Sequence, residues 1–156
     1  MEKIVMAADH AGYHLKEEIK EYLKENGYEV IDVGVNSPTT SVDYPDYVIK
    51  AIKVINSGDA SRGIITCGTG AGTAIAANKI DGIRAVAAYN TIGAYYAAAH
   101  NNANVLTLGE RLTTPLVARE IVKTWLNTPF EGGRHERRLN VIKEIEERHD
   151  VLIKGK

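Results

Sequence analysis

The sequence has only one cysteine, Cys67, and it lacks any apolar run long enough to span a bilayer. A single cysteine cannot form an internal disulfide, so the chain fits a reducing compartment, and we expect a cytoplasmic protein. The first residues lead straight into a strand-like segment and do not resemble a secretory signal. These absences argue against a secreted, disulfide-stabilised or membrane-bound protein.

Charge of either sign is not in excess, because 19 Lys and Arg residues balance 20 Asp and Glu residues to a formal net charge of -1. A general nucleic-acid binder usually carries a clear basic excess, so we expect no nucleic-acid partner. A chain of 156 residues can bury about 70% of its unfolded surface and needs no disulfide or metal ion in order to fold. Since no repeat, low-complexity tract or linker divides it, we expect one domain over residues 1–156.

Short apolar segments alternate with amphipathic segments along the whole chain. Their pattern predicts strands at residues 3–8, 28–33, 63–67, 84–88 and 104–108, a loop at 34–45, and helices at 13–26, 46–56, 71–79, 91–101, 115–126 and 134–148. This alternation is typical of the α/β class, with a five-stranded parallel sheet, helices on both faces and a C-terminal helix. Ligands in such sheets bind outside the carboxyl ends of the strands. That rule singles out Asp9-His10, the loop through Tyr44, the Cys67 loop, Tyr89-Asn90 and Gly109-Glu110-Arg111.

Cys67 stands where the third predicted strand ends and a helix begins, in Thr66-Cys67-Gly68-Thr69-Gly70-Ala71-Gly72-Thr73. Backbone N–H groups at a helix start carry partial positive charge, which favours a thiolate and can hold an anion. The glycines do not match a dinucleotide fingerprint, because Thr73 replaces the third glycine, and they lack the Gly-Lys-Ser/Thr of a P-loop. The pattern favours a reactive thiol beside an anion cradle over an inert buried cysteine in a tight turn.

Two other segments offer candidate acid–base groups. Asp9-His10 follows the first predicted strand, and because Asp9 is also a good N-cap residue, ligand binding and helix capping both remain open. His100 ends the alanine-rich helix, where it is either a functional group or a histidine stabilised by the helix dipole. We expect His14 and His149, which lie in polar helical stretches, to face solvent.

The densest basic cluster follows Gly132-Gly133 and contains Arg134 and Arg138. These arginines are four residues apart, hence on one helical face, where two guanidinium groups can clamp a phosphate. The alternative is a solvated face paired with Glu131 and Glu136. No local spacing of His, Cys and carboxylate residues is typical of a metal site, and the sequence has no Gly-x-Ser-x-Gly elbow.

Several of these motifs belong to one longer pattern that spans nearly the whole chain in a fixed order. Its stretches are Ala8-Asp9-His10-Ala11-Gly12, Asp43-Tyr44-Pro45, Cys67-Gly68-Thr69-Gly70, Ile75-Ala76-Ala77-Asn78-Lys79, Gly82-Ile83-Arg84-Ala85, His100-Asn101, Gly109-Glu110-Arg111 and Glu131-Gly132-Gly133-Arg134-His135. Together they resemble the type B ribose-5-phosphate isomerases, within the sugar-phosphate isomerase family that includes the galactose-6-phosphate isomerase subunits. The resemblance implies a Rossmann-like fold, a homodimer or dimer of dimers with sites at the subunit interface, and no cofactor.

The resemblance also implies residue roles. Cys67 would be the base that moves a proton between C1 and C2 of the sugar, and His100 would assist ring opening as a proton donor, with Asp9 nearby. Gly68, Thr69, Gly70, Ala71 and Gly72 would hold the enediolate oxygens, with the Thr69 hydroxyl as an added donor. The remaining contacts would be His10, Arg111, Arg134 and Arg138 to the phosphate or for substrate orientation, and Tyr44 and Asn101 to sugar oxygens. One branch of the family uses a glutamate base one turn into the helix; Thr73 stands there, so the chain resembles the cysteine branch.

The sequence therefore predicts an aldose–ketose isomerase of the pentose phosphate pathway that interconverts ribose 5-phosphate and ribulose 5-phosphate without a metal. Two alternatives stay open. One is an isomerase of a 6-phosphohexose such as allose or galactose 6-phosphate. The other is a non-catalytic module that binds a sugar phosphate on the same sheet.

Overall fold

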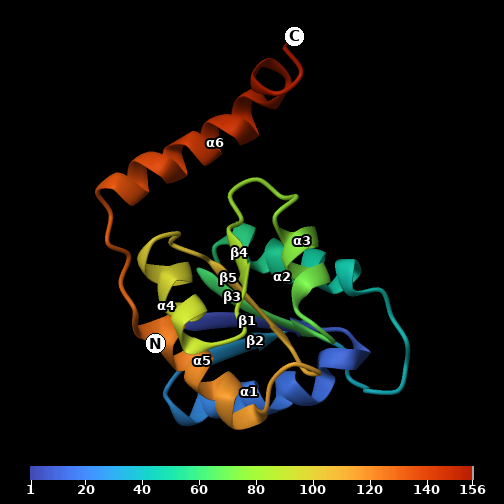
Figure 1. Ribbon diagram of the computed structural model, residues 1–156. Coiled ribbons are helices and arrows are strands. Elements are labelled where there is room, and N and C mark those ends of the chain that lie inside the picture. The colour runs from blue at the N-terminus through green and yellow to red at the C-terminus, as the bar shows by residue number, and fades with distance from the viewer. Residues whose placement is uncertain (156) are drawn as a thin grey trace.

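The computed structural model describes residues 1–155, and its core is one five-stranded parallel sheet with strand order β2-β1-β3-β5-β4 (Figure 1). The strands are β1 (Lys3–Ala8), β2 (Glu29–Asp32), β3 (Arg62–Cys67), β4 (Ala85–Ala87) and β5 (Val105–Gly109). The short 3-10 helix η1 (His10–Gly12) precedes the helices α1 (Tyr13–Glu25), α2 (Tyr44–Ser57), α3 (Ala71–Ala77), α4 (Thr91–Ala99), α5 (Pro115–Asn127) and α6 (Arg134–Leu152). This alternation confirms the predicted α/β, Rossmann-like architecture.

Helices cover both faces of the sheet because strand side chains alternate between them. Met6 and Leu106 point to the face covered by α1, α4 and α5, where the fully buried Trp125 packs. Val5 and Ile65 point to the opposite face, against α2 and α3. The two apolar layers fix β3 in the middle of the sheet and so fix the position of its last residue, Cys67.

Most predicted boundaries differ from the observed ones by one or two residues, and those at α2 and α6 bear on the site. Helix α2 begins at Tyr44, inside the segment that the sequence predicted as a loop. Pro45 occupies the first turn of α2, where the missing N–H costs no helical hydrogen bond. At the other end of the chain, the backbone of Arg148, the predicted last residue of the helix, is non-helical (φ -128°, ψ 28°), and a further helical turn follows this kink to Leu152. Tyr44 is therefore held by a helix rather than by a loop.

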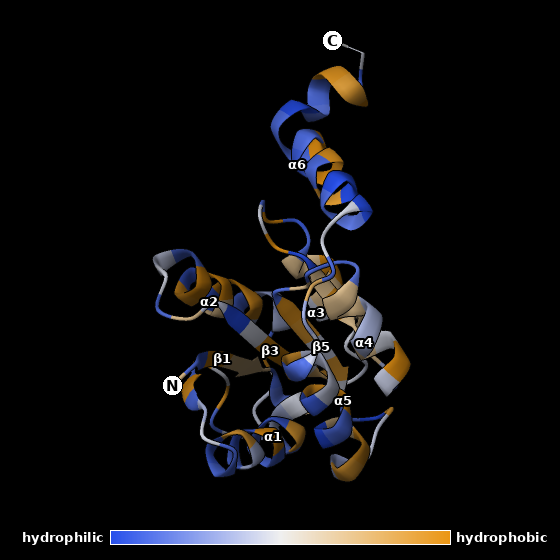
Figure 2. Cartoon of the chain, turned by 90° about the vertical axis from the view of Figure 1, so that its left-hand side faces the viewer, coloured by the Kyte–Doolittle hydropathy of each residue, from blue (hydrophilic) through white to orange (hydrophobic). Residues whose placement is uncertain are grey.

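Helix α6 projects away from the body of the molecule, and the other helices pack on the sheet (Figures 1 and 2). Gly132 and Gly133, with φ values of 67° and 58°, set the turn that leads into it. Its apolar residues Val141 and Ile142 remain exposed. A long helix with an exposed apolar stripe usually needs a partner surface in water. Within residues 1–155, no helix combines the length and the apolar character needed to cross a membrane.

Candidate active site

The Cys67 loop forms the floor of a cleft of about 300 Å³ at the carboxyl edge of the sheet. This is the edge at which we expected a ligand to bind from the sequence. The cleft brings together most of the predicted site residues that follow strands β1, β3 and β5. Its lining residues are Asp9, His10, Ala11, Tyr44, Cys67, Gly68, Thr69, Gly72 and Arg111.

The sulfur of Cys67 lies at the bottom of this cleft, and the residue is only 4% exposed. The backbone N–H of Gly70 donates a hydrogen bond to Sγ over 3.1 Å. The Thr73 hydroxyl lies 3.5 Å from Sγ and donates to the Gly70 carbonyl over 3.1 Å. Gly70 adopts a left-handed conformation, with φ of 77°, which turns its N–H back toward the sulfur. The loop therefore aims a fixed donor at the thiol.

Two glycines of this loop let side chains from other segments close over it. A Cβ atom at Gly72 would lie 2.7 Å from Cζ of Tyr44, and one at Gly68 would lie 3.0 Å from Nη1 of Arg111. Both distances are too short for ordinary contact. The absence of a side chain at these positions therefore allows the phenol of Tyr44 and the guanidinium of Arg111 to reach the cleft.

Asp9 and His10 are oriented by hydrogen bonds to the backbone. The Asp9 carboxylate accepts from the Gly12 N–H over 3.0 Å, which confirms the predicted capping role, and Asp9 is buried. His10 Nδ1 accepts from the Val42 N–H over 3.2 Å. Because a neutral imidazole carries one hydrogen, this bond leaves the hydrogen on Nε2, where it can be donated to a ligand.

Glu110, between Gly109 and Arg111 in the same motif, has a structural role. Its carboxylate accepts a hydrogen bond from the N–H of Leu15 over 2.9 Å, in the first turn of α1. The side chain thereby satisfies a free N–H group at the start of that helix. Within the motif, only Arg111 lines the cleft.

The other predicted site residues lie elsewhere in the same chain. Helix α4 runs back from the carboxyl end of β4, and His100, at its C-terminus, lies before the amino end of β5. Asn101 lines a separate groove between the body and α6. Arg134 and Arg138 are exposed on α6. Within a single chain, His100 is therefore not near Asp9. The residues that do not reach Cys67 are His100, Asn101, Arg134 and Arg138.

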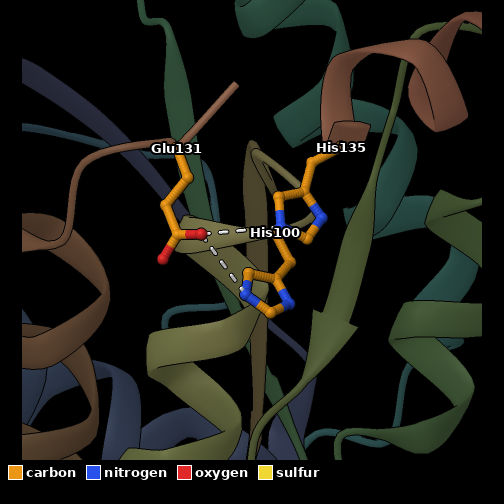
Figure 3. Close-up of side chains that lie close together, drawn as sticks. All are labelled: His100, Glu131 and His135. Carbon is orange, nitrogen blue, oxygen red and sulfur yellow. Dashed lines mark ion pairs between the residues drawn. The ribbon is translucent and has the colours of Figure 1, made fainter. Parts of the chain in front are cut away.

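His100 lies instead in a cluster with Glu131 and His135 (Figure 3). Nε2 of His100 is 3.6 Å from Oε2 of Glu131, and Nε2 of His135 is 3.5 Å from the same oxygen. The two imidazole rings stack with their centroids 3.9 Å apart. Burial and the positive charges of His100 and Arg134 lower the pKa of His135. This cluster was not predicted from the sequence, because His100 is brought to Glu131 and His135 only by the tertiary fold.

Comparison with known proteins agrees with this geometry. The family model described as Ribose/Galactose Isomerase matches residues 4–142. Ribose-5-phosphate isomerase B of Escherichia coli is 43% identical over 150 residues, which cover 96% of this chain and 100% of that protein. The structure of Clostridium thermocellum ribose-5-phosphate isomerase B has a TM-score of 0.92 and 49% identity, over 94% of this chain and 99% of that one. The Mycoplasma genitalium enzyme, solved with bound ribulose-5-phosphate, has a TM-score of 0.88 and 40% identity, over 94% and 97% of the two chains.

Proposed function

The chain belongs to the ribose/galactose isomerase family, and on that premise we propose that it is a sugar-phosphate isomerase that interconverts ribose 5-phosphate and ribulose 5-phosphate. The observation that carries the proposal is the Cys67 cleft. It combines the Cys67 sulfur, a glycine-rich loop whose Gly70 N–H donates to that sulfur, and two cationic or proton-donating side chains, His10 and Arg111, in one opening. These are the parts that proton transfer next to a carbonyl requires.

Cys67 is the proposed base. A thiolate at Sγ takes the proton from C2 of the open-chain aldose and returns it to C1, while the proton of the C2 hydroxyl passes to the C1 oxygen. No atom is gained or lost overall. The Gly70 N–H supports this role, because a charged sulfur accepts its hydrogen bond more strongly than a neutral thiol does. The nearby Thr73 hydroxyl carries no charge and does not compete as a base.

The glycine loop is the proposed binding site for the enediolate oxygens. Negative charge develops on O1 and O2 as the proton leaves carbon, and Gly68, Thr69 and Gly72 of this loop line the cleft. The N–H of Gly70 donates to Sγ of Cys67 and that of Ala71 to the Thr69 hydroxyl, so the remaining donors of the loop are the ones open to substrate. Losing one such donor typically costs about 3 kcal/mol of transition-state stabilisation. At the rim, Nε2–H of His10 and the guanidinium of Arg111 offer charge-assisted hydrogen bonds to the phosphate.

A second copy of the chain is the proposed source of the missing groups. In one chain, His100 and Asn101 lie at the C-terminal end of α4, before the amino end of β5, and Arg134 and Arg138 lie in the first two turns of α6. Its exposed apolar stripe supports packing of α6 on another chain. We therefore infer a homodimer in which His100 of one copy opens the sugar ring at the Cys67 cleft of the other. A dimer of dimers would preserve the same pairing.

An isomerase assay in the presence of EDTA tests the proposal. Purified protein is incubated with ribose 5-phosphate, and separately with allose 6-phosphate and galactose 6-phosphate, and the ketose product is measured. We expect conversion of ribose 5-phosphate that EDTA does not reduce. Faster conversion of a hexose phosphate would favour the longer substrate. Ligand binding without any ketose product would indicate a non-catalytic module and overturn the proposal.

A further inference from the structure

The cluster of His100, Glu131 and His135 contains two imidazoles and one carboxylate within reach of a single ion. One ligand atom from each residue lies within 4.8 Å of the others. The two contacts to Oε2 of Glu131 measure 3.6 Å and 3.5 Å. Three ligand atoms bound tetrahedrally to Zn²⁺ at its usual bond lengths lie about 3.4 Å from one another. Closing the cluster around an ion requires the two imidazoles, which stack 19° from parallel, to rotate until the lone pairs of both nitrogens point to one place.

A second observation points to a ligand at the same place. His135 is only 5% exposed, and among residues 1–155 its Nε2 makes no hydrogen bond, because the Glu131 carboxylate 3.5 Å away is too distant for a good one. A buried polar atom without a partner is costly, and native proteins rarely leave one unexplained. The ring stacks on His100 and turns this nitrogen toward the Glu131 carboxylate (Figure 3).

We propose that His100, Glu131 and His135 form a binding site for Zn²⁺ and that the bound ion inhibits the enzyme by occupying the His100 imidazole. Two imidazoles and one carboxylate are a ligand set that Zn²⁺ commonly takes in proteins, with a fourth position left for water. The inhibitory part rests on the proposed role of His100 in ring opening, whereas the binding part does not.

The contacts around Glu131 suit a metal ligand. Its other carboxylate oxygen, Oε1, accepts a hydrogen bond from the Tyr95 hydroxyl over 3.3 Å. Its backbone N–H donates to the Ala99 carbonyl over 2.9 Å, which ties the segment to the end of α4. Such outer contacts orient metal-binding carboxylates and raise affinity. The positive charges of Arg134 and Arg138 on α6 oppose a cation, so we expect moderate affinity.

Equilibrium dialysis of the metal-free, full-length protein against Zn²⁺ tests the binding part, and Co²⁺ gives a second readout because tetrahedral coordination produces intense visible absorption. We expect one ion per chain. Glu131→Gln and His135→Ala should each weaken binding by about tenfold or more. His149→Ala, which removes an exposed histidine from the same helix, is the matched control and should bind as the wild type does. Thermal melting shows whether each variant is folded.

Isomerase assays with added Zn²⁺ test the inhibitory part. Zn²⁺ should inhibit the wild type and the His149→Ala variant, EDTA should reverse the inhibition, and Glu131→Gln should need about tenfold more Zn²⁺ for the same loss. Absence of bound ion, or binding unaffected by both cluster substitutions, overturns the site. Binding at the cluster with full activity overturns the inhibition. If the metal-free protein converts no sugar phosphate, the proposed function fails, and the dialysis result still decides the metal site.

Discussion

At the scale of single residues, the proposed proton transfer depends on the sulfur of Cys67. It is nearly buried, faces one backbone donor, and has a neutral hydroxyl as its other polar neighbour. Among residues 1–155, Asp9 is the one carboxylate that lines the cleft, and its Oδ1 accepts the capping hydrogen bond from the Gly12 N–H. We therefore expect proton transfer to depend most strongly on the thiol.

Cys67→Ala is expected to reduce kcat by about a thousandfold or more, because general base catalysis alone commonly contributes 10²–10⁴-fold. The smaller side chain leaves the surrounding strand intact, so thermal melting should change little. The control is Thr73→Val, which removes the hydroxyl near Sγ, keeps the shape of that side chain and leaves Cys67 in place. This variant should retain most activity. Wild-type turnover by the folded Cys67→Ala variant would show that the base is another group.

A buried lysine makes a second residue-scale prediction, this time on stability. Lys16 is 1% exposed and its ammonium contacts Asp32 at 2.6 Å and Glu17 at 2.7 Å. Burial alone would raise the pKa of Asp32, but hydrogen bonds from Lys16 and Lys20 outweigh it and hold that pKa below its usual value. A carboxyl with a lowered pKa stabilises the fold above its unfolded value, near 3.9, and loses that contribution as the pH falls through the folded value.

Asp32→Asn should therefore lower the free energy of unfolding by about 1–3 kcal/mol at neutral pH, because it leaves a buried ammonium with one fewer charged partner. The difference from wild type should shrink below about pH 4. Urea unfolding at several pH values measures it. Glu21→Gln, which breaks an exposed pair with Lys24, is the control and should cost less than about 1 kcal/mol. An equal loss in both variants would contradict the importance of burial.

At the scale of elements, α6 contacts the body through His135, which stacks on His100, and through Glu146, which accepts a hydrogen bond from the Gly82 N–H over 3.0 Å, but much of its apolar stripe stays exposed. Arg134 and Arg138 stand on the turn nearest the body, and the apolar positions follow. An arginine that binds phosphate acts mainly on substrate affinity, since the phosphate is remote from the reacting carbons. We therefore expect substitution of an α6 arginine to change KM more than kcat.

Arg134→Ala should raise KM for ribose 5-phosphate by about tenfold or more, a loss of at least one charge-assisted hydrogen bond, with a smaller effect on kcat. Steady-state kinetics give both constants. Arg148→Ala, at an exposed position near the other end of α6, is the matched control and should leave KM unchanged. An unchanged KM for Arg134→Ala would rule out this arginine as a phosphate ligand.

Much of the element scale could be predicted from sequence, and the exceptions have physical reasons. Short continuous apolar runs predicted the central strands, and the glycines predicted the Cys67 turn, because both depend on neighbouring residues. The start of α2 at Tyr44 was missed, since Pro45 suits a loop as well as a first helical turn. The projection of α6 away from the body could not be predicted from the sequence either, because an amphipathic helix has the same pattern whether it covers its own sheet or another chain.

At the scale of the whole molecule, the predicted site is divided between two parts of the surface. Residues that follow strands meet at the Cys67 cleft, as the rule for parallel sheets requires. His100 could not be placed with them from its sequence position, because a crossover helix returns the chain to the other edge. Its contact with Glu131 and His135 depends on the tertiary fold alone. A divided site makes a specific prediction about mixed dimers.

Cys67→Ala and His100→Ala chains should each be inactive alone but regain activity when unfolded and refolded together. In a mixed dimer, one cleft then combines an intact Cys67 with an intact His100, and the other cleft lacks both. Random pairing makes half of the dimers mixed, with one working cleft each, so about one quarter of wild-type activity is expected. Two copies of the same variant refolded together are the control. Failure to recover activity would place both groups in one chain.

The turn at Gly132-Gly133 has a stereochemical consequence. No neighbouring atom lies within 4 Å of where a side chain at either position would begin, so space does not exclude a larger residue. The positive φ angles of Gly132 and Gly133 exclude a larger L-residue, because L-amino acids avoid that region and D-amino acids prefer it. A semisynthetic chain with D-alanine at 133 should keep the direction of α6, whereas L-alanine there should redirect it, so the handedness of one α-carbon decides whether α6 can reach a second copy of the chain.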